Sequence, residues 1–378
     1  MLKRFSLTLL ILISWSFAQT TVGPYQFSTI KNNEASPVDN QFRTYTCWSF
    51  SSLSFFESEL KRLGKPTVNL SEMYVVRNTY AAKARRYIRM HGNSTFAPGG
   101  AFYDAINIFT SHGIVPEDVY AGKDYGEKKH IHTEMDAVLE ASIKALVTNP
   151  NGRLSSAWPQ VIEGILDAYL GEVPESFNWE GKNYTPKTFL QYTGIQPEDY
   201  IQVGSYTHHP FYSKFALEVP DNWTNSLVLN IPLDEFAKLL EKAVTEGYPV
   251  AWATDVSDKG FSHKNGLAIV PQNEFNEMKK AELDSIFAKP ISQRIITQEM
   301  RQKAFDNYET QDDHGMHITG LVKDQNGNTF YIVKNSYGAD SNDCGGYVYA
   351  SESYVLYKTT CIMVHKDAIP AELKAKIK

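Results

Sequence analysis

The stretch "NQFRTYTCWSF", residues 40–50, places a glutamine six positions before Cys47 (47 − 41 = 6). Apolar residues then recur every three or four positions from Phe50 to Leu63, and Gly64 follows. This period predicts an amphipathic helix that begins at Cys47 and ends at Gly64. A helix N-terminus carries partial positive charge and free N–H donors, which lower the pKa of a thiol. The pattern therefore indicates a helix that presents a reactive cysteine at its start.

The helical period recurs through the first two thirds of the chain, whereas the last third alternates as strands do. This order predicts an α+β protein with two lobes. Helices are expected over 71–91 with Ser71 as N-cap, within 98–115 up to Gly113, and over 133–147, 158–170 and 233–246; strands are expected over 248–256, 317–322, 329–335, 345–351 and 357–366.

Asn326-Gly327 is a strong hairpin signal between two of these strands. A two-residue turn there would set Asn335 opposite Ile318 in the pairing. A wider loop or a β-bulge would instead bring Asn335 closer to His314. The sequence leaves these alternatives open.

The composition bounds the class of protein. With 378 residues, of which 42% are hydrophobic, the chain can bury one large core or two lobes. Its formal net charge is −6, whereas a nucleic-acid partner requires a basic face. We therefore expect no nucleic-acid partner.

The N-terminus has the pattern of a signal peptide. Positive residues 3–4 precede an apolar stretch, 7–15, that is too short to span a bilayer. Residues 16–18 fit the small-x-small rule, so cleavage is expected after Ala18. We therefore expect the mature protein to be exported to a periplasm or to the exterior, without stable membrane insertion. A buried N-terminal helix is the alternative.

The chain has three cysteines, Cys47, Cys344 and Cys361. An odd number of cysteines in an exported chain leaves at least one thiol outside any intramolecular disulfide. Three cysteines are also too few for a fold that depends on disulfides for its stability. Cys344 and Cys361 either pair with each other or are ordinary core or loop residues. The second interpretation is favoured, because cysteine is often buried as a small hydrophobic residue.

A reactive thiol needs a partner that takes and returns a proton, usually histidine. The groups "HIH" (130–132) and "HH" (208–209) lack the spacing of a metal-ligand motif, so no metal or organic cofactor is predicted. In "DDHGMHITG" (312–320), His314 precedes a predicted strand, and "VKNSYG" places Asn335 near the end of the returning strand. An Asn side chain can hold one imidazole nitrogen while the other faces a thiol. Taken alone, Cys47, His314 or Asn335 would more often have a structural role than a catalytic one. Taken together, they indicate nucleophilic catalysis.

These motifs together resemble those of papain-type cysteine peptidases. "SPVDNQ", "CWSFS", "LSE", "PGGAFYDAINIFTSHGIVPEDVY", "DHGMHITG" and "KNSYG" occur in family order between about residues 36 and 370. The 267 residues from Cys47 to His314 (314 − 47 = 267) exceed the roughly 130–150 of simple papain-like enzymes. A long insert, with "NWEGKNYTPKTFLQYTG" and "EGYPVAWATDV", is most similar to the bleomycin hydrolase and aminopeptidase C branch.

The resemblance implies a papain-like fold of two lobes with an inserted helical region. It divides the chain, after the signal segment 1–18, into three parts. These are a helical lobe with the nucleophile helix (19–126), the mainly helical insert (127–245), and a β-rich, barrel-like lobe with the histidine and asparagine (246–378).

The resemblance also implies catalytic roles. Cys47 matches the nucleophile, His314 the general base and acid, and Asn335 the residue that orients the imidazole. Gln41 matches the oxyanion-hole amide, which donates to the developing negative charge together with the Cys47 N–H.

Five positions are expected to bind the substrate. Gly99 and Gly100 match the glycine pair whose backbone pairs with an extended substrate, and Trp48 follows the nucleophile. Tyr45 stands where the family usually has glycine, and it either narrows the adjacent subsite or shifts the loop. Tyr337 stands where tryptophan is common and shields the bond between His314 and its asparagine less completely.

The implied function is that of an exported cysteine peptidase with aminopeptidase activity, acting on peptides and assembled as a homohexamer. In the bleomycin hydrolase branch a C-terminal arm lies in the cleft and recruits the free amino end of the substrate. Here the chain stops at "IPAELKAKIK", and we expect a truncated arm. An endopeptidase is therefore the first alternative. A non-catalytic papain-fold binding protein, supported only by Tyr45, is the second, and transglutaminase-like acyl transfer ranks below both.

Overall fold

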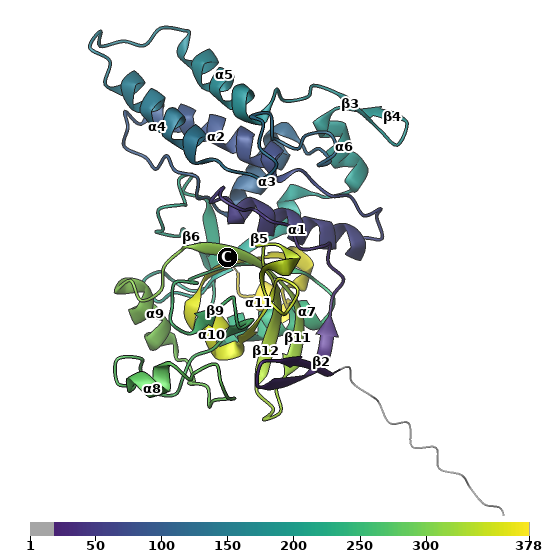
Figure 1. Ribbon diagram of the computed structural model, residues 1–378, viewed down its shortest axis with the longest axis vertical. Coiled ribbons are helices and arrows are strands. Elements are labelled where there is room, and N and C mark those ends of the chain that lie inside the picture. The colour runs from purple at the N-terminus through teal and green to yellow at the C-terminus, as the bar shows by residue number, and fades with distance from the viewer. Residues whose placement is uncertain (1–18, 378) are drawn as a thin grey trace, which may run out of the picture.

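Two lobes pack against each other along α1, the helix that begins at Cys47 (Figure 1). The computed structural model describes residues 19–377, so the predicted signal segment, residues 1–18, lies outside the described residues. Helices make one lobe and a large sheet makes the other, which confirms the α+β prediction. In the described part of the chain, no helix is both long enough and apolar enough to cross a membrane.

The ends of the helices in the first lobe follow local signals. The Ser71 hydroxyl accepts the Tyr74 N–H at 3.0 Å and caps the second helix. Gly113 ends the third helix with φ +87°, a conformation that favours glycine. The helices are α1 (Cys47–Arg62), α2 (Glu72–Arg89), α3 (Phe102–His112), α4 (Thr133–Val147), α5 (Trp158–Leu170) and α6 (Pro186–Thr193). A short hairpin, β3 (Phe177–Trp179) and β4 (Lys182–Tyr184), accompanies them.

One large sheet forms the centre of the second lobe. Its strands run in the order β6-β7-β5-β14-β8-β11-β12-β13-β10-β9, and β2 pairs with β1 and β11. Three of its strands, β5 to β7, come from the insert 127–245. The strands are β1 (Gln19–Val22), β2 (Tyr25–Asn32), β5 (Tyr200–Gly204), β6 (Ser213–Ala216), β7 (Leu227–Asn230), β8 (Val250–Thr254), β9 (Phe261–Ser262), β10 (Leu267–Ala268), β11 (His314–Lys323), β12 (Thr329–Lys334), β13 (Tyr347–Ser351) and β14 (Thr359–His365).

Helices pack around this sheet (Figure 1). The longest of them, α7, buries one apolar face, which includes Phe236 and Leu240, against the core of the sheet. These helices are α7 (Leu233–Thr245), α8 (Lys280–Leu283), α9 (Gln298–Asp306), α10 (Glu352–Lys358) and α11 (Ala371–Lys374).

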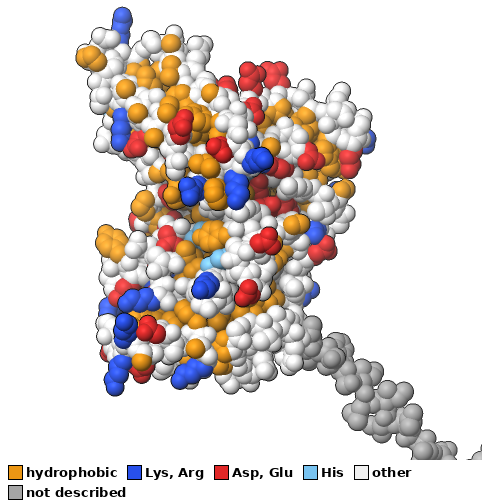
Figure 2. Space-filling model, viewed as in Figure 1, with side chains coloured by type: hydrophobic (Ala, Val, Ile, Leu, Met, Phe, Trp, Pro, Cys, Tyr) orange, Lys and Arg blue, Asp and Glu red, His pale blue; other side chains and the backbone are white. Residues whose placement is uncertain are grey.

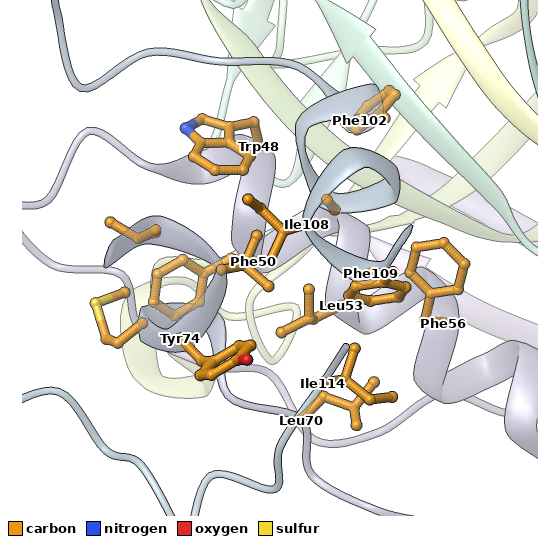
Figure 3. Packing of buried hydrophobic residues seen from close by; sticks show 14 of the residues in the cluster. Trp48, Phe50, Leu53, Phe56, Leu70, Tyr74, Phe102, Ile108, Phe109 and Ile114 are labelled. Carbon is orange, nitrogen blue, oxygen red and sulfur yellow. The ribbon is translucent and has the colours of Figure 1, made fainter. Parts of the chain in front are cut away.

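α1 is the buried element between the lobes. Every residue from Trp48 to Leu60 is buried, and the apolar ones pack against α2 and α3 (Figure 3). Elsewhere on the helix, the hydroxyl of Ser54 lies 2.9 Å from His317 Nδ1 in β11. Burial of one large apolar side chain contributes about 1.5–3 kcal/mol, so the many in α1 fix it firmly. The position of Cys47, its first residue, is thereby fixed as well.

The β11–β12 hairpin is wider than a two-residue turn at 326–327. Lys323 pairs with Thr329, which leaves residues 324–328 in the loop. Asp324 shapes this loop, because its Oδ1 atom accepts two loop N–H groups at 2.9 and 2.8 Å. A side chain that replaces backbone partners in this way stabilises a longer turn.

A β-bulge adds to the effect of the wider loop. The pairing of β11 with β12 shifts register between Ile318 and Gly320. Beyond the bulge His317 pairs with Lys334, so the next position along sets Asn335 opposite Met316, and not opposite Ile318. Of the alternatives that the sequence left open, the structure has no two-residue turn but both a wider loop and a bulge, and these bring Asn335 toward His314.

Candidate active site

Cys47 and His314 each begin a structural element, α1 and β11. Gly315 lies against the first turn of α1, where a Cβ atom would be 2.7 Å from Ser51 Oγ and 3.4 Å from Trp48 Cα. A side chain at this position would therefore push β11 away from α1. The close approach brings His314 to the same cavity that Cys47 lines.

Asn335 holds one nitrogen of His314. His314 Nε2 lies 2.8 Å from Asn335 Oδ1, and both side chains are buried. The backbone N–H of Ser336 donates to the same oxygen at 2.8 Å. A backbone N–H can only donate, so the oxygen of the amide, and not its nitrogen, faces the imidazole. His314 Nε2 then carries the hydrogen, and Nδ1 is the nitrogen left for the thiol.

Gln41 is fastened to the loop that follows Asn335. Its backbone N–H donates to the Ser336 carbonyl at 2.9 Å. The Ser336 hydroxyl in turn donates to Gln41 Oε1 at 2.7 Å. Because the amide oxygen is engaged, the amide N–H groups of the buried Gln41 side chain are the ones that remain to donate.

The six-residue spacing between Gln41 and Cys47 accommodates a tight loop. Phe42 and Tyr45 have φ angles of +47° and +57°, in the left-handed region. Tyr45 therefore takes a left-handed backbone conformation that glycine adopts without strain. Its side chain is 61% exposed, and it forms part of the cavity wall. Tyr45 therefore contributes its side chain to the rim of the cavity.

The segment "HIH" supports this loop through its backbone. The Arg43 N–H donates to the His130 carbonyl at 3.0 Å, and the His132 N–H donates to the Arg43 carbonyl at 3.0 Å. Burial lowers the pKa of His130 to about 4 and that of His132 to about 3. Both rings are therefore neutral parts of the packing beneath the loop.

Desolvation dominates the charge states of the thiol and the imidazole. Burial raises the pKa of Cys47 to about 12, although backbone N–H groups of Gly315 and Trp48 lower it. Burial lowers the pKa of His314 to about 4, against the hydrogen bond that His314 donates to Asn335, which raises it. The lowering of the thiol pKa expected from the helix N-terminus is thus outweighed. A proton that moves from sulfur to imidazole creates both charges at once, so the two groups ionise as a pair.

A cavity of about 170 Å³ opens beside Cys47 and His314. The predicted substrate-binding residues Gly99 and Gly100 line it, as do Tyr45 and Trp48. Trp48 Nε1 donates to the Pro98 carbonyl at 3.0 Å and holds the glycine loop in place. The surface is hollowed at the junction of the two lobes, where histidine atoms are visible (Figure 2).

Tyr337 lies beside the catalytic candidates and not in the cavity wall. Its ring centroid is 5.1 Å from that of His314. It therefore covers the imidazole that Asn335 holds, as the aromatic residue at this position is expected to do.

Three carboxylates, those of Asp221, Asp312 and Asp313, line the cavity, and its lining holds no Lys or Arg. Burial and the neighbouring Asp221 raise the pKa of Asp312 to about 7, although the Thr360 hydroxyl donates to it at 2.9 Å. Burial likewise raises the pKa of Asp313 to about 6. The cavity is therefore suited to a cationic group.

Asp221 reaches the cavity from the insert. Trp223, two residues further on, donates from Nε1 to Asp104 Oδ2 at 3.0 Å and docks the β6–β7 loop on α3. The Asp221 carboxylate packs on Gly99, where any Cβ atom would overlap it. Sequence reasoning gave no role to Asp221 or Asp312. The stretch "DNWTN" carries no periodicity that signals its place in the fold, and nothing about Asp312 in the sequence marks it except its position near His314.

One group of three metal-binding side chains in the described residues lies close together, His208, His209 and Glu218, with ligand atoms within 4.8 Å. Gln302 Oε1 accepts the Thr207 N–H at 2.6 Å, so its Nε2 atom donates to His208 Nδ1 at 2.9 Å. His208 then carries its hydrogen on Nε2, which faces Glu218 at 3.1 Å. A metal requires an unprotonated nitrogen there, so this arrangement suits a hydrogen-bonded cluster.

Cys344 and Cys361 are both free thiols, as the favoured interpretation expected. Cys361 is buried and forms part of the cavity wall. Burial raises the pKa of Cys361 above the usual range, and its Sγ atom donates to Gln202 Oε1 at 3.6 Å.

Comparisons with known proteins agree on one family. The model of the Peptidase C1-like family matches residues 18–378. Aminopeptidase C from Lactococcus lactis subsp. cremoris is 24% identical over 373 residues, which cover 89% of this chain and 82% of that protein. Bleomycin hydrolase from Mus musculus is 22% identical over 404 residues, which cover 92% of this chain and 84% of that protein.

The fold is similar to that of a solved structure, PepW from Lactobacillus rhamnosis HN001. The TM-score is 0.69 at 21% identity, and the match covers 93% of this chain and 84% of PepW. The papain-like fold and the likeness to the aminopeptidase C and bleomycin hydrolase branch, both predicted from the motifs, are confirmed.

The contact at Gly315 gives a testable prediction. Gly315→Ala places a methyl group against Ser51 Oγ and is expected to lower the free energy of unfolding by about 1–3 kcal/mol, as overpacking does. Ser51→Ala removes the obstructing hydroxyl, so Gly315→Ala combined with Ser51→Ala should recover most of the loss. Urea unfolding of the four proteins measures this coupling. If the changes in the free energy of unfolding caused by Gly315→Ala and Ser51→Ala simply add in the double variant, the assigned contact is contradicted.

Proposed function

Since the chain belongs to the Peptidase C1-like family, we propose that it is an exported cysteine peptidase that removes residues from the amino ends of peptides by a Cys–His–Asn mechanism. The observation that carries the mechanism is the arrangement of His314. It lines one cavity with Cys47, while its Nε2 atom is held by Asn335 at 2.8 Å. The nitrogen left free is therefore available to the thiol.

In the proposed mechanism His314 Nδ1 takes the proton of Cys47 as the sulfur attacks the peptide carbonyl carbon. The new S–C bond leaves negative charge on the carbonyl oxygen. The Gln41 amide and the Cys47 N–H donate to that oxygen, and removal of one such donor typically costs about 10²–10³ in kcat. The orientation of Gln41, with its oxygen bound by Ser336, supports its part in this step.

The second half of the proposed reaction returns the proton. The C–N bond breaks as His314 protonates the leaving amine. Water, deprotonated by His314, then attacks the thioester carbon and releases the acyl group from Cys47. Asn335 holds the imidazole throughout, so the same nitrogen serves as base and as acid.

Two observations support attack at the amino end of peptides. The matched relatives include proteins named aminopeptidase C. The cavity is lined by three carboxylates and by no Lys or Arg, and therefore suits the ammonium group of a free amino end.

One observation favours the endopeptidase alternative. The described C-terminal tail lies away from the cavity: Lys376 Nζ pairs with Glu235 Oε1 of α7 at 2.6 Å, and Ile377 packs on the apolar cluster of α7. The residues that line the cavity include none beyond Cys361 in the described chain. The described tail therefore places no barrier in the cleft.

Cleavage of one peptide in two forms, free and acetylated at its amino end, decides between these functions. We expect stepwise loss of residues from the free form only, with Cys47→Ala inactive on both, under reducing conditions and with products mapped by mass. Internal cleavage of the acetylated form would establish an endopeptidase. Equal results for wild type and Cys47→Ala would favour the non-catalytic binding protein.

The ionisation of Asp312 predicts a pH dependence of substrate binding. Its pKa, raised to about 7, leaves it neutral at pH 5.5 and charged at pH 8. A cationic amino end should therefore bind more tightly as the pH rises through 7. Asp312→Asn stays neutral throughout, so its KM relative to that of wild type should rise from near one at pH 5.5 to about tenfold at pH 7.5. Steady-state kinetics measures this ratio, and a flat ratio would exclude Asp312 from binding the amino end.

The proposed export is tested by the mass of the protein produced from the full sequence in a bacterial host. We expect a chain that begins at Gln19 and is found outside the cytoplasm, because residues 1–18 have the pattern of a signal peptide. Leu10→Arg, which interrupts the apolar stretch, should keep the chain intact and inside. An intact wild-type chain in the cytoplasm would contradict export. The homohexamer implied by the resemblance stays a prediction.

A further inference from the structure

His263 contacts the amide nitrogen of Asn335. It follows β9 directly and is half-buried. Its Nδ1 atom lies 3.2 Å from Asn335 Nδ2, and its Nε2 atom lies 2.8 Å from Ser341 Oγ. No motif in the sequence pointed to this histidine.

The directions of the hydrogen bonds around Asn335 fix the protonation of His263. Asn335 Oδ1 accepts the backbone N–H of Ser336 at 2.8 Å and faces His314 Nε2 at 2.8 Å. The amide nitrogen is therefore the atom that faces His263. An amide nitrogen can only donate, so His263 Nδ1 is the acceptor and carries no hydrogen.

The other nitrogen of His263 agrees with this assignment. The Ser341 hydroxyl donates its one hydrogen to the Gly338 carbonyl at 2.5 Å. It must then accept from His263, which carries its hydrogen on Nε2. A neutral His263 satisfies both contacts, and burial lowers the pKa of His263, which favours the neutral form.

Tyr337 packs on both imidazole rings. Its ring centroid lies 4.9 Å from that of His263 and 5.1 Å from that of His314. Tyr337 and Ser341 belong to the same loop after β12, which therefore holds the amide of Asn335 together with both histidines. The series of hydrogen bonds runs in one direction, from His314 through Asn335 and His263 to Ser341.

We propose that His263 is a positioning residue for the reaction: by accepting a hydrogen bond from Asn335, it fixes the amide with its oxygen toward His314. His314 then keeps its hydrogen on Nε2 and an unprotonated Nδ1 for the thiol of Cys47. This inference rests on the proposed peptidase function and adds a residue 51 positions before His314 (314 − 263 = 51).

Loss of the acceptor at position 263 removes one of the contacts that orient the amide. A flipped amide presents its NH₂ group to His314 Nε2, which must then be unprotonated. The hydrogen of the neutral imidazole moves to Nδ1, where it opposes transfer of the proton from Cys47. The expected effect is therefore on kcat, with little effect on the binding of the substrate.

Asparagine and leucine form a matched pair for the test, because they have nearly the same shape. Asparagine carries an oxygen near the position of His263 Nδ1, whereas leucine carries no acceptor. We expect His263→Leu to lower kcat for peptide cleavage about tenfold at nearly unchanged KM, the effect of one lost hydrogen bond. His263→Asn should stay within about threefold of wild type. Similar values of kcat for the two variants would overturn the proposal.

Alkylation of Cys47 by iodoacetamide gives a readout that needs no peptide substrate. The adduct is mapped by mass, so that Cys344 and Cys361 do not contribute. We expect Cys47 to be alkylated faster in wild type and in His263→Asn than in His263→Leu. If wild type cleaves peptides no faster than Cys47→Ala, the proposed function fails, and the alkylation rates still test His263. Equal alkylation rates for the two variants would overturn its role.

Ser341→Ala provides a second test should His263→Leu fail to fold. It removes the acceptor that keeps the hydrogen of His263 on Nε2, so the ring can adopt the other tautomer. We expect kcat and the Cys47 alkylation rate to fall about threefold. Unchanged values of both would overturn the proposal.

Discussion

The close approach of β11 to the first turn of α1 is the contact on which the site depends. The apolar core of the helical lobe fixes α1, and the sheet fixes β11. The two meet at Gly315, where the space beside Ser51 Oγ cannot hold even a Cβ atom. Cys47 and His314 thus come from separately packed lobes, and one missing side chain decides whether they share a cavity. The local requirement is a residue without a Cβ atom beside the Ser51 hydroxyl.

Ser336 forms hydrogen bonds with both polar side chains of the site, Asn335 and Gln41. Its backbone N–H donates to Asn335 Oδ1, and its hydroxyl donates to Gln41 Oε1. Its carbonyl accepts the Gln41 backbone N–H. Ser336 therefore contributes to the direction of both amides, the one that holds His314 and the one proposed to stabilise the oxyanion. The six-residue spacing between Gln41 and Cys47 therefore lets Gln41 bind Ser336 as well as lie near the start of α1.

The parts of the fold that could be predicted are those with local causes. α4 and α5 begin and end at the predicted residues, because periodicity and end signals lie within each segment. The β11–β12 register could not be predicted, since Asp324 widens the loop with its side chain and a bulge adds a further shift. Asp221 and His263 were missed for a related reason. Each reaches the site through contacts between segments far apart in the chain, which leave no pattern in the sequence.

The charge of the cavity links substrate binding to the reactivity of the thiol. Asp221 and Asp312 each raise the pKa of Cys47, in addition to the larger effect of burial. A cationic amino end bound between these carboxylates would offset their charge and so ease ionisation of the thiol. The same cation would favour the charged form of Asp312, which the neighbouring Asp221 opposes. Above the pKa of Asp312, where that carboxylate is already charged, a peptide with a free amino end would therefore ease ionisation of the thiol, whereas a blocked peptide would not.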